Sequence, residues 1–437
     1  MTEPRRGELT VRRERAFLVG VISPHERRRA ESCLSELSAL ARTARARIVG
    51  EVVQHLPHPN PRSYLGGGKA AEVRDLAKAV DADVVLCDSD LSPAQIRNLE
   101  ELLDIKVVDR SELILDIFAT HARTRQARLQ VELAQLEYAY PRLRRMWSHL
   151  SRYEGGIGTR GPGETQLETD RRLVTRRIAD LKRELRVIDR RREREVAARG
   201  EHFKVGIVGY TNAGKSTLMN ALTDAGVVVE DALFATLDTR TRRWELNGRG
   251  EALLSDTVGF IRKLPHHLVE SFKATLEEAY HADLLLHVVD VSRHDAIEQA
   301  EAVTEVLGEI GCGDKRVLHV LNKTDAVDDG TALHILSERH PDAVAVSALR
   351  HEGLDALTEA VLRELQRDHV ELEVTFPSSD GKLAAFLFQH ADVLSRHDED
   401  FTARMHVRLS RRHLRMISRH GDVKVRTIDG KDATHET

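Results

Sequence analysis

The sequence has 437 residues, 41% of them hydrophobic and 31% charged, and a formal net charge of −4. This composition excludes an intrinsically disordered chain, and the length exceeds the roughly 100–200 residues of one domain, so a multidomain globular protein is expected. The alternation of strand-like and helix-like runs described below makes the expected fold α/β. Uncharged apolar runs of about 18 residues, as needed to cross a bilayer, are absent from the sequence. The short apolar run Ala16–Ile22 ends at Pro24 without a cleavage pattern, so we expect no signal peptide.

The three cysteines, Cys33, Cys87 and Cys312, are widely separated. They form neither a C-x-x-C zinc spacing nor an even-numbered disulfide framework. We therefore expect a cytoplasmic protein that makes no membrane contact.

Residues 1–120 are expected to form an N-terminal α/β domain. Helix-favouring stretches, Glu31–Ala41 and Ala70–Val80, alternate with β-branched runs, which is typical of a mainly parallel sheet. The expected strands are Ala16–Ile22, Ile48–Val53, Val84–Leu86 and Ile105–Val108. The segment Gly66–Lys69 opens a helix that could receive a phosphate, but the rest of a P-loop spacing is missing and a plain turn is the favoured interpretation.

Residues 121–200 are expected to form a basic helical hairpin. They carry 20 basic and 11 acidic residues, which leaves −13 for the rest of the chain. A polyanionic partner or a solvated helical face would each explain this charge. Two helix-favouring stretches, 111–150 and 164–199, carry apolar stripes at helical spacing that would face each other, namely Leu129, Leu133, Leu136, Tyr140 and Leu143 in the first and Val174, Ile178, Leu181, Leu185 and Ile188 in the second.

Gly155–Glu164 joins these two helices and has five glycines and one proline in ten residues, which argues against a helix there. A flexible linker would explain the segment. A mobile tip, whose unhindered amides and Arg160 approach nucleic-acid phosphates, would explain it equally well.

Residues 201–366 are expected to form a nucleotide-binding domain. The strand-like Val205–Val208 leads into a G-x-x-x-x-G-K-[ST] motif, after which Leu218–Leu222 begins a helix. Such a loop turns its backbone N–H groups around phosphates, while Lys215 reaches the β- and γ-phosphates and Ser216 gives a hydroxyl to Mg²⁺. The predicted phosphate-binding residues are Gly209, Tyr210, Thr211, Asn212, Ala213, Gly214, Lys215, Ser216 and Thr217.

A D-x-x-G motif follows the strand-like Ala252–Leu254 and comprises Asp256, Thr257, Val258 and Gly259. After a P-loop and at the end of a strand, Asp256 is expected to hold magnesium through water and the Gly259 amide to approach the γ-phosphate. A GTPase also needs a threonine that closes onto magnesium between the two motifs. The spacing leaves three candidates open, Thr236, Thr239 and Thr241.

Base recognition is predicted from two further segments, each after an apolar strand: Asn322, Lys323, Thr324 and Asp325, and then Ser347, Ala348 and Leu349. A buried carboxylate at Asp325 can accept hydrogen bonds from the N1–H and the amine of guanine, whereas adenine would leave it unpaired. A backbone amide of the second segment can close over the base. GTP should therefore be bound in preference to ATP.

Residues 367–437 are expected to form a small C-terminal α/β domain without a catalytic signature. Its predicted elements are a strand at Leu372–Phe376, a helix at Lys382–Ser395 and a strand at Arg404–Leu409.

Over nearly its whole length the chain resembles the HflX-type GTPases. The most specific similarity is Gly155–Glu164 running into Gln166–Glu168 and Asp170–Arg172, together with the helical pair and Tyr64–Lys69. A further segment is similar to the family's first switch and selects Thr236 as the magnesium ligand; it comprises Phe234, Ala235, Thr236, Leu237 and Asp238. Its continuation as Thr239 and Arg240 departs from the proline common in better-known members.

The resemblance implies a cytoplasmic, Mg²⁺-dependent GTPase that binds the large ribosomal subunit and splits or rescues stalled ribosomes under stress. It also implies that the N-terminal domain and the hairpin reach ribosomal RNA, with Gly155–Gly163 at the tip. We expect a monomer. A regulatory module whose GTP switch exposes a protein-docking surface, without ribosome contact, is the alternative.

Hydrolysis is expected to be slow in the isolated protein. Where many GTPases have a glutamine that orients water, this sequence has Phe260, which cannot hydrogen-bond water. A partner is expected to complete the site. Asn212 resembles the asparagine of potassium-activated GTPases, although a loop asparagine that satisfies its own backbone explains it equally well.

Overall fold

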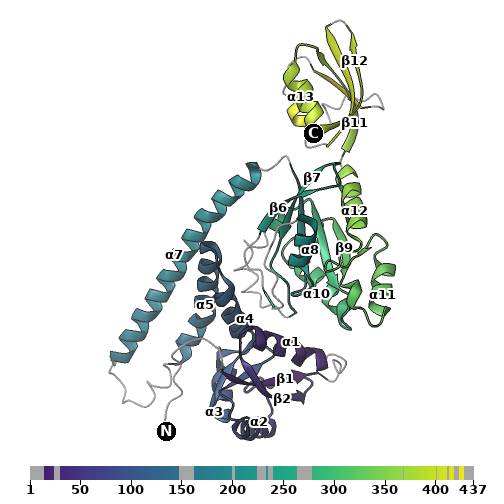
Figure 1. The fold of residues 1–437 in the computed structure, drawn as a ribbon. Coiled ribbons are helices and arrows are strands. Elements are labelled where there is room, and N and C mark those ends of the chain that lie inside the picture. The colour runs from purple at the N-terminus through teal and green to yellow at the C-terminus, as the bar shows by residue number, and fades with distance from the viewer. Residues whose placement is uncertain are drawn as a thin grey trace.

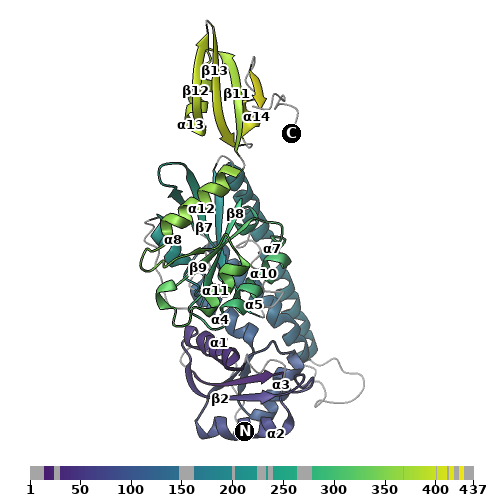
Figure 2. The ribbon, with the colours of Figure 1, turned by 90° about the vertical axis from the view of Figure 1, so that its right-hand side faces the viewer.

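The computed structural model describes residues 14–23, 30–146, 162–198, 202–223, 233–234, 240–262, 278–367, 369–399, 401–410, 413–417 and 423–427. Three α/β parts follow one another along the molecule, and a long helix runs beside the first two (Figures 1 and 2). Within the described ranges, no helix is both long and apolar enough to cross a membrane. The predicted multidomain α/β fold is confirmed.

The N-terminal part is a parallel sheet of order β2-β1-β3-β4. Its strands are β1 (Arg15–Ile22), β2 (Arg47–His55), β3 (Val84–Cys87) and β4 (Lys106–Val108), and its helices are α1 (Ala30–Thr43), α2 (Gly67–Ala79), α3 (Pro93–Leu103) and α4 (Arg110–His121). Apolar residues of β1 alternate between two cores: Leu18 packs in the core that contains residues of α1 and α4, and Val19 in the core that contains residues of α2 and α3. Helices therefore cover both faces, as a buried parallel sheet requires.

The predicted helix at 111–150 is divided in two. Helix α4 ends at His121, because Ala122 is extended, and α5 (Arg125–Met146) begins after Thr124, whose hydroxyl accepts from the Ala127 N–H at 3.2 Å. Helix α4 packs against the N-terminal sheet, whereas α5 extends away from that sheet and packs along α7 (Figure 1).

Helix α7 (Pro162–Ala198) begins two residues earlier than predicted. Proline is tolerated in the first turn of a helix because its missing N–H would have no partner there. The two predicted stripes meet: Leu129 and Leu133 of α5 are buried against Leu181 and Leu185 of α7. Most of the predicted tip, 155–161, lies outside the described residues.

The central part has a six-stranded sheet of order β10-β9-β8-β5-β7-β6, parallel except for β6. The strands are β5 (Phe203–Gly209), β6 (Arg240–Glu245), β7 (Glu251–Asp256), β8 (Leu284–Asp290), β9 (Val317–Asn322) and β10 (Val344–Ala345). The helices are α8 (Lys215–Thr223), α10 (Ala296–Glu309), the short η2 (Thr324–Ala326), α11 (Thr331–Arg339) and α12 (Leu354–Arg367). Every residue of β8 is buried, as expected at the centre of such a sheet.

The C-terminal part is an antiparallel sheet of order β12-β13-β11-β14 with its own core. It comprises β11 (His369–Pro377), α13 (Gly381–His390), β12 (Ala391–Glu399), β13 (Thr402–Ser410), α14 (Leu414–Ile417) and β14 (Lys424–Thr427). The helix predicted to reach Ser395 ends at His390. The residues after it form β12 instead, because pairing with β13 satisfies their backbone and Val393 packs against the core.

Candidate functional site

The predicted phosphate loop lies where β5 ends and α8 begins, in the middle of the sheet. Because β5 has β7 on one side and β8 on the other, its carboxyl end is the point at which open α/β sheets bind ligands. The Lys215 ammonium is buried there and donates to the carbonyls of Gly209 (3.2 Å) and Tyr210 (2.7 Å). Burial lowers the pKa of Lys215 to about 8 against the opposing charge of Asp256, so the group stays largely protonated at neutral pH.

Two glycines allow the close approaches that a phosphate cradle needs. Gly214 has a φ of +91°, and a Cβ there would lie 2.3 Å from the side-chain amide nitrogen of Asn322. At Gly259 a Cβ would lie 2.8 Å from the Thr211 Cα and 2.9 Å from the Lys215 ammonium. Any larger residue at either position would displace the loop or the lysine.

The oxygen groups predicted to serve magnesium lie together. Asp256 is fully buried at the end of β7 and accepts a 2.7 Å hydrogen bond from the Ser216 hydroxyl. A hydroxyl beside a carboxylate fits Mg²⁺, which prefers oxygen ligands. Thr257 anchors this motif by donating to the Ile207 carbonyl at 2.7 Å. The other predicted ligand, Thr236, lies outside the described residues, as do Ala235, Leu237, Asp238 and the candidate Thr239.

The two predicted base-recognition segments lie side by side. The Asn322 side chain donates to the Ala213 carbonyl (2.9 Å) and accepts from the Ala348 amide (3.1 Å), which ties both segments to the phosphate loop. Ser347 donates to the Asp325 carboxylate at 2.6 Å, and this bond holds the pKa of Asp325 below its usual range. Asp325 is half-exposed rather than buried as predicted, because it lies in the short η2 turn at the rim.

Lys323 and Leu349 complete the rim of this side of the site. Lys323 has a φ of 65° and its ammonium bonds the Asn212 carbonyl (2.9 Å) and the Asp290 carboxylate (2.7 Å). Leu349 is 73% exposed and leaves an apolar side chain beside the predicted base position. The structure thus brings the four predicted motifs to one edge of the sheet.

Phe260, where a water-orienting glutamine would stand, is buried and bound to the phosphate loop through its backbone. Its N–H donates to the Gly209 carbonyl (3.1 Å), and its carbonyl accepts from the Thr211 N–H (2.7 Å). The segment after the D-x-x-G motif is thereby fixed to the loop that would hold the phosphates.

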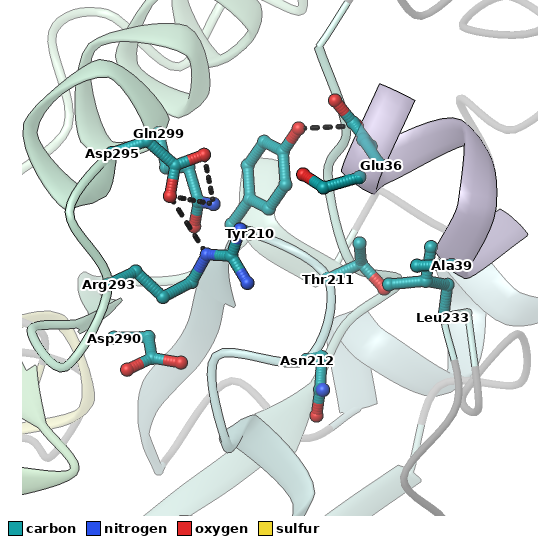
Figure 3. Close-up of a pocket in the computed structure, with 11 residues that line it drawn as sticks. Glu36, Ala39, Tyr210, Thr211, Asn212, Leu233, Asp290, Arg293, Asp295 and Gln299 are labelled. Atoms are coloured by element: carbon teal, nitrogen blue, oxygen red, sulfur yellow. Dashed lines mark hydrogen bonds and ion pairs between the residues drawn. The ribbon is translucent and has the colours of Figure 1, made fainter. Parts of the chain in front are cut away.

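The N-terminal part also contacts the loop, which sequence reasoning missed. The Tyr210 hydroxyl donates to Glu36 of α1 at 2.6 Å, and Phe234 packs edge-on against Phe118 of α4, with ring centroids 4.7 Å apart. Between α1 and the loop is a pocket of about 130 Å³ into which Tyr210 and Arg293 project (Figure 3). Glu36 is 174 residues from Tyr210 in the chain, so no local pattern could have signalled the contact.

Four family descriptions match consecutive stretches of the chain. They are "GTP-binding GTPase N-terminal" over residues 31–119, "GTP-binding GTPase Middle Region" over 121–199, "50S ribosome-binding GTPase" over 204–323 and "HflX C-terminal domain" over 332–428.

Two relatives match most of this chain. The GTPase HflX of Lacrimispora saccharolytica is 50% identical over 395 residues, or 90% of this chain and 93% of that protein. The GTPase HflX of Escherichia coli is 43% identical over 380 residues, 86% of this chain and 89% of that protein. A crystal structure of a GTP-binding protein from the archaeon Sulfolobus solfataricus in complex with GDP is 25% identical, with a TM-score of 0.41, and the match covers 80% of this chain and 99% of that one. The chain belongs to the HflX family and is a GTPase.

Proposed function

We propose that this chain is a Mg²⁺-dependent GTPase that associates with the large ribosomal subunit in the cytoplasm and splits or rescues stalled ribosomes. In this proposal the four parts, 1–120, 121–200, 201–366 and 367–437, act as one monomer. GTP sets the arrangement of the switch segments, and hydrolysis releases the protein.

In the nucleotide site we assign charge neutralisation to Lys215 and the loop amides, and base selection to Asp325. Ser216, Thr236 and, through water, Asp256 would hold Mg²⁺, which would supply positive charge against the phosphates of the nucleotide. The Gly259 amide would meet the γ-phosphate. Since Phe260 offers no hydrogen bond to water, a docked partner has to complete the site for rapid turnover.

The observation that carries the ribosome part of the proposal is an arginine stripe on α7. Opposite the apolar stripe that packs on α5, the helix exposes five arginines at helical spacing: Arg172, Arg176, Arg183, Arg186 and Arg190. The acidic residues of α7 in the described burial range, Asp180, Glu184 and Asp189, lie toward its flanks, and Asp180 pairs with Arg183. A cationic face some 30 Å long by helix geometry fits an extended polyphosphate backbone.

The comparisons support the same partner. The description matched over 204–323 names the 50S ribosome, and a large ribosomal subunit presents the RNA phosphates that an arginine stripe would bind. The alternative, a GTP-switched protein-binding module, would make no use of this stripe.

Sedimentation with ribosomes tests the proposal. Full-length protein with GTP, GDP or a non-hydrolysable GTP analogue is mixed with 70S ribosomes and with isolated 50S subunits, over a salt series. We expect co-sedimentation with 50S that is strongest with the analogue and that weakens steeply as salt rises, because phosphate contacts release counterions. Ribosome profiles in the same mixtures report splitting as a shift from 70S to subunits.

Two double variants show whether ribosome binding depends on the arginine stripe or on the total positive charge of the protein. Replacing Arg176 and Arg183 by glutamine should weaken co-sedimentation and flatten its salt dependence. The same replacement at Arg316 and Arg339, which lie on the central part, should leave co-sedimentation and its salt dependence unchanged. Salt-independent binding, or none in any nucleotide state, would leave the protein-binding module as the better explanation.

We further propose that Asn212 supports a K⁺ ion at the phosphates. It has a φ of 60°, and its carbonyl is already held by Lys323. Turnover is compared in KCl and in NaCl of equal ionic strength. Equal rates would exclude the ion and leave Asn212 as a loop residue that satisfies its own backbone.

A further inference from the structure

The central sheet places a buried carboxylate beside one of the predicted base-recognition segments. Asp290 is the last residue of β8, and in the sheet it is paired with Asn322 at the end of β9. The Asp290 side chain is 6% exposed, and its carboxylate lies 2.7 Å from the Lys323 ammonium. Asp290 therefore lies outside the four predicted nucleotide motifs but contacts one of them.

The two carboxylate oxygens of Asp290 have different partners. Oδ1 accepts from the Ser292 amide at 3.1 Å and from the Ser292 hydroxyl at 2.5 Å, whereas Oδ2 faces the Lys323 ammonium. The two bonds from Ser292 fix the rotation of the carboxyl group and so direct Oδ2 at the lysine. An asparagine here would have a single acceptor oxygen and could not serve both partners.

The Lys323 side chain connects Asp290 to the phosphate loop. Its ammonium also donates to the Asn212 carbonyl at 2.9 Å, and a Cβ at Gly214 would lie 3.8 Å from the Lys323 Cε. The lysine therefore lies along the loop. Its own backbone has a φ of 65°, a left-handed conformation that is unfavourable for a residue with a Cβ. Interactions of the side chain have to offset this cost, and the ion pair with Asp290 is one of them.

A second cation close to Asp290 has a carboxylate of its own. The Arg293 Nε donates to Asp295 at 2.9 Å, and the Gln299 amide donates to both Asp295 oxygens at 3.1 Å (Figure 3). Since Arg293 is paired with Asp295, Lys323 keeps Asp290. The Asp295 side chain is 7% exposed, so it is buried as deeply as Asp290 and provides a matched control.

We propose that Asp290 is a positioning residue for nucleotide retention, which holds the Lys323 ammonium across the phosphate loop and thereby sets the rate at which GDP and GTP dissociate. Without this anchor the long lysine side chain regains rotamers, and the rim of the site beside the base loosens. The ion pair lies on the base side of the loop, so hydrolysis of bound GTP should not depend on it. The inference rests on the nucleotide site proposed above.

The test measures release of N-methylanthraniloyl-GDP from full-length protein after addition of excess unlabelled GDP. Asp290→Asn should release the labelled GDP about tenfold faster, as expected for loss of one hydrogen bond to a charged group. Its association rate constant and its single-turnover hydrolysis rate at saturating GTP should be unchanged. A merely structural role of Asp290 would not separate release from hydrolysis in this way.

The matched control is Asp295→Asn. It removes an equally buried negative charge, but its remaining oxygen can still accept from Arg293 and Gln299. GDP release from this variant should equal that from the unchanged protein. Release as fast as from Asp290→Asn would show that any lost carboxylate loosens the site, and would overturn the proposal.

A double variant shows whether Asp290 acts through the lysine. Lys323→Met should release GDP at least as fast as Asp290→Asn, and the double variant should match Lys323→Met alone. Unchanged release from Asp290→Asn, or effects that multiply in the double variant, would overturn the proposal.

Two further outcomes are distinguishable. If Asp290→Asn does not fold, as judged by thermal unfolding, Ser292→Ala takes its place: it frees the carboxyl group to rotate and should raise the release rate about threefold, and an unchanged rate would overturn the proposal. Failure of the unchanged protein to retain labelled GDP would overturn the nucleotide site and this inference with it. Normal retention with unchanged release from the variants would overturn this inference alone.

Discussion

The N-terminal sheet and the central sheet each have a buried cation at the carboxyl ends of their parallel strands, Arg110 and Lys215, and the two cations differ in how nearby carboxylates compensate their charge. Burial by itself lowers the pKa of Arg110, but Glu36 and Asp88, which form ion pairs with this guanidinium, outweigh it and raise the pKa. Lys215 has mainly backbone carbonyls as partners, and burial lowers its pKa to about 8. A buried cation without a full anionic partner is suited to bind a phosphate, whereas a compensated one joins domains.

The largest expected effect is that of Arg110→Met, which would remove the Arg110 cation from Asp88 and Glu36. The free energy of unfolding of the N-terminal part should fall by about 3–5 kcal/mol, as for other broken buried ion pairs. Urea unfolding measures this loss. A loss of unfolding free energy below about 1 kcal/mol would contradict the view that Arg110 stabilises the fold by joining its parts.

Lys215→Ala should instead spare the fold and abolish function. GTP hydrolysis is expected to fall by about 10²- to 10³-fold, as when one preorganised donor to a developing negative charge is removed. Binding of GTP and of ATP should weaken together, since both present the same phosphates. Fluorescent-nucleotide titration with a thermal melt as control checks this; an unchanged rate would remove Lys215 from the proposed site.

A third test concerns His287, a buried neutral group on β8 near Lys215. Burial, together with His319, His340 and Lys215, lowers the pKa of His287 to about 3. The unfolded chain therefore binds more protons between about pH 6.5 and 3, so stability is complete above pH 6.5 and is lost as the pH falls. At pH 5 the loss should be about 2 kcal/mol.

His287→Leu should remove the contribution of His287 to this acid sensitivity, whereas the contribution of His319, whose pKa is lowered to about 4, should remain. Urea unfolding of both proteins at pH 5 and pH 7 makes the comparison. Equal pH dependence of the two proteins would mean that His287 is protonated or solvated in the fold.

The smallest expected effect is that of Asp325→Ala, a variant that distinguishes recognition of the base from recognition of the phosphates. Asp325→Ala should weaken GTP binding about tenfold, at the low end for hydrogen bonds to a charged group because this carboxylate is half-exposed. ATP binding should not change, in contrast to Lys215→Ala. Parallel titrations with both nucleotides check the difference, and an equal loss of both would assign Asp325 a structural role.

Sequence reasoning was most successful where a function depends on neighbouring residues. The phosphate loop, the D-x-x-G motif and the base-recognition segments were each predicted at the end of a strand, and the structure places them there. Two predicted helices were too long: 111–150 is divided into α4 and α5, and the last residues of Lys382–Ser395 form the strand β12. Tertiary pairing with β13 outweighed the local helix preference of that stretch.

The sequence by itself determined the phosphate-binding chemistry, because a P-loop is a local arrangement of backbone amides that its own glycines and lysine specify. It also indicated the family, through the segment Gly155–Glu164 and the residues that follow it. Only the tertiary structure decided that Glu36, Arg110 and Phe118 meet the nucleotide site. Those contacts join residues that are far apart in the chain, and their free energy depends on burial and on charge pairing, which no local pattern encodes.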